Sequence, residues 1–245
     1  MTHQGTPIFM AREAVQCRPI ASHPWTGVFY GLPRLSDEAH QYYDVALQSR
    51  LASFPQPSTH QQRFVRQHRE WIDFDYIETL RWSHALRHDA ESAFWLLVWW
   101  AVHIRSADSE DVSFIPSDVW SDLTTVDVDT KKDNRGDFLT GLIKTPNQPW
   151  LDPGYNGLAP LFQEMVQQIC ADLYWVKEGA PLGEACPVEM EKPDFLHEAL
   201  QRLIFNFLIA HRDEEWMTSP KHADHRKTEL QSRNTDASTV TPMSF

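Results

Sequence analysis

The stretch HDAESAFWLLVWWAVHI, residues 88–104, decides the fold of this chain. From Asp89 to Ile104 the side chains are apolar nearly all round, so a helix formed here has no face suited to water and must be enclosed by other helices. Asp89 at its beginning suits both a helix cap and the positive end of the helix dipole. The longest apolar run, Phe94–Val102, is about half as long as a bilayer requires. We therefore predict a buried central helix and no membrane span.

Amphipathic stretches lie on both sides of this helix in the sequence. Ser36 offers an N-cap to a helix over Asp37–Leu51. Apolar residues recur at helical intervals in several further segments, which we predict to be helices: Gln61–Leu80, Ser117–Leu123, Lys131–Ile143, Leu158–Val176 and Asp194–Trp216. No series of strand patterns is strong enough to build a sheet. The predicted fold class is mainly α.

The chain divides into three predicted regions. Proline and glycine interrupt residues 1–35 so often that no long helix fits there, which predicts an irregular N-terminal segment. Residues 36–217 hold the predicted helices. Residues 218–245 are dominated by Ser, Thr, His, Lys and Asp without periodicity, which predicts a disordered tail.

Composition excludes some classes of partner. The chain has 245 residues, a formal net charge of −12 and a pI near 5.4, so it offers no basic face to nucleic acid. Acidic side chains crowd one stretch, which is either a solvated loop or a docking site for a basic partner. Its acidic residues are Asp108, Glu110, Asp111, Asp118, Asp122, Asp127, Asp129, Asp133 and Asp137.

The cysteines and the N-terminus predict an intracellular, cytoplasmic or nuclear, location. Cys17, Cys170 and Cys186 are widely spaced, which fits neither a disulfide framework nor a zinc pattern. The opening MTHQGTPIFM has no basic region followed by an apolar run, so it is not a secretory signal.

Two short motifs carry a resemblance to a known family. Residues 5–13, GTPIFMARE, resemble the end of a protein kinase activation segment, and residues 88–100, HDAESAFWLLVWW, resemble the H-D-x-E-S-x-F-x-x-L-x-W signature of the fungal-type protein kinases. Their order along the chain is that of the family, and together with the spacer they cover roughly the first two fifths of it. The resemblance implies the helical C-terminal lobe of the protein kinase-like fold.

The resemblance gives each matched residue an expected role. The resemblance places Gly5 and Thr6 in the loop next to the substrate of an intact kinase. It makes Glu13 the carboxylate of a buried ion pair with an Arg of the later helices, for which Arg202 and Arg212 are both candidates. The proline of the family motif is replaced here by Arg12.

The resemblance also gives Asp89 a second role, beside capping its helix. In kinases the corresponding Asp accepts hydrogen bonds from the backbone of the catalytic loop and holds that loop in register. This chain, however, would give Asp89 no such loop to hold.

The catalytic parts of a kinase are not evident in the sequence. We find no glycine-rich loop, no strand Lys paired with a helix Glu, no H-R-D followed by its Asn and no D-F-G. We expect a truncated fungal-type kinase domain, pseudokinase-like and inactive alone. No residue is assigned as catalytic, and ATP and magnesium are expected only in an intact parent kinase. If the DNA upstream of the Met1 codon encoded an in-frame D-F-G and H-R-D, the start of this gene would have been assigned wrongly.

Two other functions stay open. The chain could be a non-catalytic interaction or regulatory module that binds a protein through the acidic stretch or through the lobe face that a missing catalytic loop would cover. Alternatively, His84 and His88, four residues apart with Asp89 adjacent, could ligate a metal, but no third ligand is evident and we assign none. The tryptophans are expected to be mostly buried: Trp71, Trp82, Trp95, Trp99, Trp100, Trp175 and Trp216.

Overall fold

The computed structural model describes most of the chain, and 70% of the described residues are helical. The described ranges are 6–16, 28–58, 63–65, 83–106, 115–130, 132–145, 148–170, 192–218 and 221–222. Several residues named above lie outside them, namely Gly5, Cys17, Trp71, Trp82, Asp108, Glu110, Asp111, Trp175 and Cys186. The mainly α class is confirmed.

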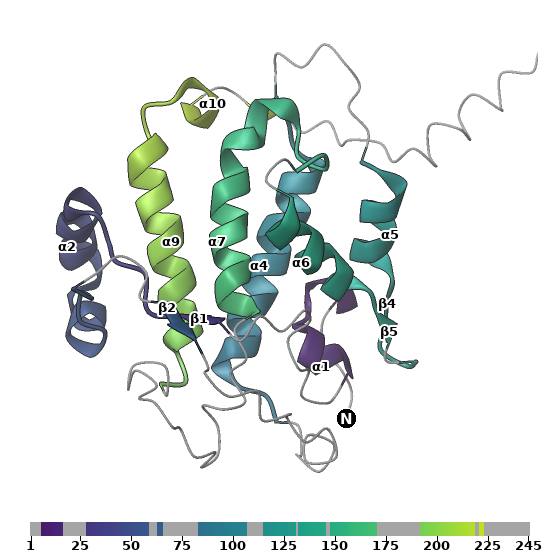
Figure 1. Ribbon diagram of the computed structural model, residues 1–245. Coiled ribbons are helices and arrows are strands. Elements are labelled where there is room, and N and C mark those ends of the chain that lie inside the picture. The colour runs from purple at the N-terminus through teal and green to yellow at the C-terminus, as the bar shows by residue number, and fades with distance from the viewer. Residues whose placement is uncertain are drawn as a thin grey trace, which may run out of the picture.

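The helices and strands follow one another along the chain as shown in Figure 1. The helical elements are η1 (Pro7–Phe9), α1 (Arg12–Gln16), α2 (Asp37–Ser53), α4 (Leu86–His103), α5 (Ser117–Thr124), α6 (Arg135–Lys144), η2 (Pro153–Leu158), α7 (Ala159–Ile169), α9 (Phe195–His211) and α10 (Glu215–Thr218). The strands are β1 (Val28–Tyr30), β2 (Arg63–Val65), β3 (Arg105–Ser106), β4 (Val126–Asp127), β5 (Lys132–Asp133) and β6 (Lys221–His222).

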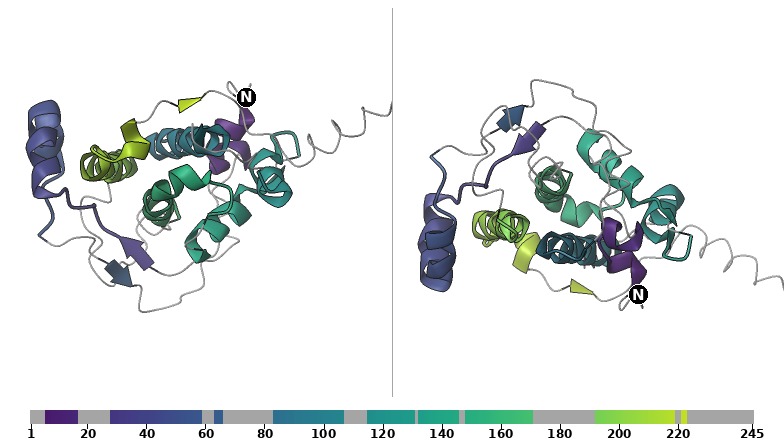
Figure 2. Two further views of the ribbon diagram at one scale, coloured as in Figure 1. Left: turned by 90° about the horizontal axis from the view of Figure 1, so that it is seen from above. Right: turned by 90° about the horizontal axis from the view of Figure 1, so that it is seen from below.

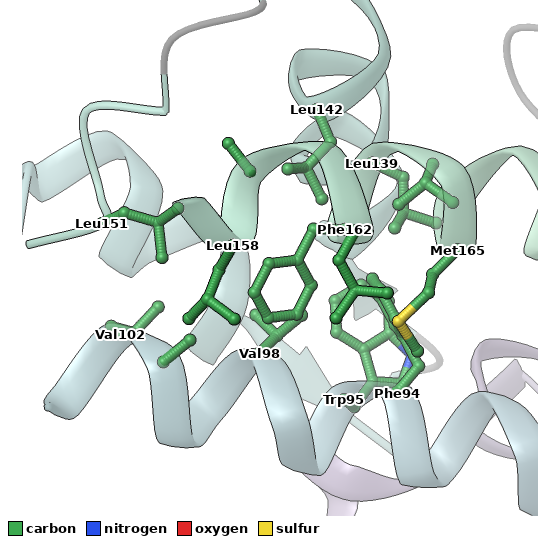
Figure 3. Close-up of a cluster of buried hydrophobic side chains, with 14 of the residues drawn as sticks. Phe94, Trp95, Val98, Val102, Leu139, Leu142, Leu151, Leu158, Phe162 and Met165 are labelled. Carbon is green, nitrogen blue, oxygen red and sulfur yellow. The ribbon is translucent and has the colours of Figure 1, made fainter. Parts of the chain in front are cut away.

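The predicted central helix is α4, and it forms one wall of the main core. Figure 3 shows Phe94, Trp95, Val98 and Val102 of α4 facing apolar side chains of α6, η2 and α7. Ala90, Phe94, Val98, Ala101 and Val102 are almost completely buried. This burial follows from the apolar content of the segment, because each fully buried Val or Phe side chain contributes about 1.5–3 kcal/mol.

The long helices pack around this core. In both views of Figure 2, α4 and α9 lie side by side and α7 covers one side of the pair, while α2 lies on the far side of α9. Both α4 and α9 end near η2: β3, which follows α4, contacts η2, and Trp216, which follows α9, contacts Tyr155. The two helices therefore run in the same direction.

The strands were not expected. Each pairs antiparallel with one other strand: β1 with β2, β3 with β6, and β4 with β5. The predicted helix over Gln61–Leu80 is wrong at Arg63–Val65, which is β2, and residues 66–80 lie outside the described part. Likewise Lys221–His222, within the predicted tail, forms β6, while 223–245 is not described. These strands are too short for a period of two to show in the sequence.

The first long helix is capped as predicted. Ser36 Oγ accepts a hydrogen bond from Ala39 N at 3.1 Å, and α2 begins at Asp37. Leu47 has non-helical backbone angles, so α2 is kinked at that residue. Only one side of α2 contacts the body of the protein, where Ala39 and Tyr43 are buried.

None of the helices in the described ranges has the length and apolarity needed to cross a membrane.

Candidate functional site

The two motif segments meet in a buried polar cluster, which we call the docking cluster: Arg12, Glu13, Arg87, His88, Glu91, Trp95, Asp133 and Arg135. Arg12 Nε donates to Glu91 Oε1 at 2.7 Å, and the backbone N of Arg12 donates to the same oxygen at 3.2 Å. Ala11 N donates to Ser92 Oγ at 3.1 Å. Residues about 80 positions apart in sequence are thus joined by direct polar contacts.

The Arg12–Glu91 pair is buried and stays ionised. Burial alone would lower the pKa of Arg12, but the charge and hydrogen bond of Glu91 raise it above its usual range. Burial likewise would raise the pKa of Glu91, but the charge of Arg12 and its hydrogen bond lower it. Trp95 Nε1 also donates to Glu91 Oε1, at 3.1 Å. Arg12 therefore anchors α1 to α4.

Arg135 completes the cluster from the beginning of α6. Its side chain is fully buried and donates to both carboxylate oxygens of Asp133, at 2.8 and 2.5 Å. Arg135 Nη1 donates to the backbone oxygens of Ile8, at 3.0 Å, and Met10, at 2.6 Å. Its guanidinium group lies 4.7 Å from the ring centre of Trp95. One side chain therefore fixes the path of residues 8–10.

Glu13 forms an ion pair, but not with the predicted partners. Arg87 Nη2 and His88 Nε2 each lie 2.7 Å from Glu13 Oε2. Burial would raise the pKa of Glu13, but the hydrogen bond from His88 and the charge and hydrogen bond of Arg87 lower it to about 2. Both partners come from the first turn of α4, so the predicted ion pair with an Arg is present, but Arg202 and Arg212 were the wrong candidates for it.

The two predicted partners pair elsewhere. Arg202 Nε donates to Glu198 Oε1 at 2.7 Å, in a fully buried pair within α9. Tyr43 and Arg50 of α2 also bind Glu198, at 3.0 and 2.9 Å. Arg212 contacts Glu38 and Asp213. The pairs of Glu198 and Arg212 fasten α2 to α9 and are separate from the docking cluster.

His88 has a defined tautomer. Ala85 N donates to His88 Nδ1 at 2.9 Å, so Nδ1 must be an acceptor. The ring proton is then on Nε2, which donates to Glu13.

Because α4 begins at Leu86 with Ala85 as its N-cap, Asp89 lies inside the first turn and the predicted capping role of Asp89 is wrong. Its position still suits the helix dipole.

The remaining predicted site residues lie at the surface. Asp89 has a 51% exposed side chain, and His84 Nε2 lies 3.1 Å from its carboxylate. Thr6 is exposed and precedes η1, where its backbone oxygen accepts from Phe9 N at 3.0 Å. His84 and His88 have adjacent rings, but no group of three metal-ligating side chains occurs in the described ranges.

The sequence contains one H-R-D tripeptide, without the Asn that completes the kinase motif. His211-Arg212-Asp213 reads H-R-D, but the position of the Asn is taken by Thr218. His211 ends α9, whereas Asp89 lies at the beginning of the parallel helix α4. The length of α9, about 25 Å at 1.5 Å per residue, separates the two ends. This tripeptide is therefore not a loop that Asp89 could hold.

A second candidate surface lies on α4 and α9. Large apolar side chains are exposed there: Leu86 (46%), Leu96 (56%) and Trp100 (41%) on α4, and Leu208 (44%) on α9. Ala93 of α4 is also exposed, and Ile204 of α9 is half-buried. We call these six residues the α4–α9 face. Among the described tryptophans, Trp95 and Trp150 are buried, Trp99, Trp120 and Trp216 are half-buried, and Trp100 is exposed. Of the tryptophans expected to be mostly buried, Trp95 alone is fully buried in the described ranges.

Some acidic side chains in the described part of the acidic stretch form contacts within the fold. Asp133 is buried with Arg135, and Asp127 accepts hydrogen bonds from the backbone of Asp129 and Thr130 in the β4–β5 turn. Asp122 is partly exposed, and burial together with the nearby charges of Asp137 and Asp118 raises its pKa. The stretch is not a uniformly solvated loop.

No protein-family model, curated protein or solved structure matches this chain.

Proposed function

We propose that this chain is a helical module similar to the C-terminal lobe of the fungal-type protein kinases, related to serine/threonine kinases, and that it transfers no phosphate by itself. The observation that carries the proposal is the docking cluster. It brings the segment that resembles an activation-segment end onto the helix that resembles the family signature. Two unrelated motifs would not be expected to contact each other in the fold, whereas two parts of one lobe would.

The chemistry of the cluster supports a scaffolding role for Glu13. A carboxylate held ionised by Arg87 and His88 ties α1 to the beginning of α4. In the family an ion pair of the corresponding Glu ties the same segment to the lobe, although from another helix. The change of partner is a departure from the family pattern, and Arg12–Glu91 adds a second pair beside it.

The surroundings of Asp89 support the absence of phosphate transfer. Its carboxylate is half exposed and is bonded to a side chain, His84, instead of to the backbone of a loop. A catalytic loop held from this position would cover it. Thr6 and Asp89 are in this proposal remnants of a kinase surface, with no role in chemistry.

The test uses purified chain whose fold is first checked by circular dichroism. With ATP and magnesium we expect no phosphate transfer to protein substrates and no saturable nucleotide binding, measured by radiolabel transfer and by calorimetry, with an active kinase run in parallel. Transfer that survives Asp213→Asn would indicate an unrelated catalytic site, and transfer abolished by it would assign a catalytic role to the H-R-D tripeptide. Either result would overturn the proposal.

We propose as a second candidate function that the chain acts by binding another protein. The α4–α9 face favours it, because large exposed apolar side chains on helices that are otherwise well packed favour contact with a partner. This face is favoured over the acidic stretch, since Asp127 and Asp133 of that stretch are engaged within the fold.

Two variants distinguish binding through the α4–α9 face from binding through the acidic stretch. Leu96→Ser alters the face, and Asp118→Asn with Asp129→Asn neutralises two exposed acids of the stretch. Binding that is lost only in the first variant supports the face, and binding lost only in the second would assign the interaction to the acids instead.

A further inference from the structure

The chain that follows α9 returns to the body of the protein. α10 lies just beyond the end of α9 (Figure 1), and β6 pairs with β3, the strand that follows α4. We call residues 214–222 the strap, of which 214–218 and 221–222 are described. α10 has no buried residue, and β6 pairs with β3 over two residues. The described part of the strap therefore buries little surface.

Trp216 joins the strap to the body of the protein. The ring centre of Trp216 lies 6.4 Å from that of Tyr155 in η2 and 5.9 Å from that of Phe207 in α9. Tyr155 and Phe207 are buried and belong to the main core, whereas Trp216 is half-buried against it. Trp216 Nε1 also donates to Glu214, so the indole is held from within the strap as well.

Gly157 makes room for the Trp216 ring. A methyl group at residue 157 would lie 2.9 Å from Cζ2 and 3.1 Å from Cε2 of Trp216. Carbon atoms in normal contact are about 3.5–4.0 Å apart, so the indole could not stay where it is. The absence of a side chain at Gly157 is therefore a condition for the position of Trp216.

We propose that the strap is a releasable segment, held closed by the Trp216 ring on Gly157, and that it opens as one unit while the core stays folded. Segments that bury little apolar surface open locally at a lower free energy than the core. Tyr155 and Phe207 remain with the core when the strap opens, so the parts of their rings that Trp216 covers become exposed. The strap thus controls access to an apolar surface, a property beyond both proposed functions.

A side chain at residue 157 should displace the strap and leave η2 in place. Tyr155 and Leu158 of η2 are buried in the main core, whereas α10 has no buried residue. The backbone at Gly157 is outside the left-handed region, and the three atoms nearest to an added methyl group all belong to Trp216. Alanine at residue 157 therefore acts mainly on the Trp216 ring.

Hydrogen exchange of the full chain measures the opening. The amides of α10 and of the β3–β6 pair should exchange at one common rate, faster than the amides near Leu203 in the middle of α9. Gly157→Ala should speed both groups by about tenfold, because losing one aromatic contact changes an equilibrium by up to about that factor. Exchange in the middle of α9 should not change. The matched control is Gly141→Ala in α6, where nothing lies within 4 Å of the added methyl group, and it should alter none of these rates.

A second variant separates release of the strap from damage to the core. Trp216→Ala should speed exchange at the same amides, and adding Gly157→Ala to it should change nothing further, because the methyl group then meets no indole. Effects of the two substitutions that simply add would overturn the proposal. It would also be overturned if neither variant speeds exchange in α10, or if exchange near Leu203 rises together with that in α10.

Discussion

At the scale of single residues, the buried charges decide how the N-terminal segment is held. Glu13 has a pKa of about 2 in the folded chain, compared with 4.5 for an unperturbed Glu, because Arg87 and His88 outweigh the effect of burial. A carboxyl whose pKa is lowered by folding stabilises the protein above its unfolded pKa and loses this contribution as the pH falls toward its folded pKa.

Glu13 should therefore contribute to acid sensitivity. We expect Glu13→Gln to lower the free energy of unfolding at pH 7 by up to about 3 kcal/mol, since each pKa unit corresponds to 1.36 kcal/mol. The difference from the original chain should shrink between pH 4.5 and pH 2. Urea unfolding at a series of pH values measures it. A difference that is constant with pH would show that the substitution acts through packing and not through the charge.

At the scale of elements, α2 is attached to α9 by polar contacts as well as apolar ones. Its buried side consists mainly of Ala39 and Tyr43, and it is attached to α9 through Glu198, which accepts hydrogen bonds from Tyr43 Oη and Arg50 Nε. Burial and the adjacent Glu198 raise the pKa of Tyr43, so its hydroxyl remains a donor at all ordinary pH values. The link between α2 and α9 thus includes a charged hydrogen-bond network beside the apolar contacts of Tyr43, Phe205 and Ile209.

Tyr43→Phe tests this link with little change of shape. We expect a loss of about 1.5–3 kcal/mol, the usual contribution of a hydrogen bond to a charged group, together with faster proteolysis within α2. Tyr42→Phe is the control, because Tyr42 is exposed on the same helix and should change neither quantity. Equal proteolysis rates in the two variants would mean that apolar contacts alone hold α2.

At the scale of the whole molecule, the sequence predicted the helices well and the contacts between them poorly. The apolar content of Phe94–Val102 was enough to predict a buried helix, and Ser36 was enough to predict where α2 begins. Both signals are local. The partner of Glu13 was predicted wrongly, since the choice among several arginines depends on the three-dimensional path of residues 6–16, which no local pattern contains.

Other features had no signal strong enough to be found in the sequence. Arg135 looks like any surface Arg at the start of a helix, and only the fold reveals that it binds the backbone oxygens of Ile8 and Met10. The exposure of Leu96 and Trp100 could not be predicted residue by residue, because their segment is apolar on all sides. Sequence alone could predict that some apolar lobe face is exposed, but not which side of α4 forms it.

The interlocking of Arg12, Glu91 and Arg135 has a consequence for motion. Detaching residues 8–13 would leave buried ions without partners, which costs about 3–5 kcal/mol for each broken pair, so the segment should open only when the core does. The amides of Ala11 and Arg12, bonded to Ser92 Oγ and Glu91 Oε1, should then exchange with deuterium as slowly as those in the middle of α4. Rapid exchange at these two amides would show that this short helix frays independently.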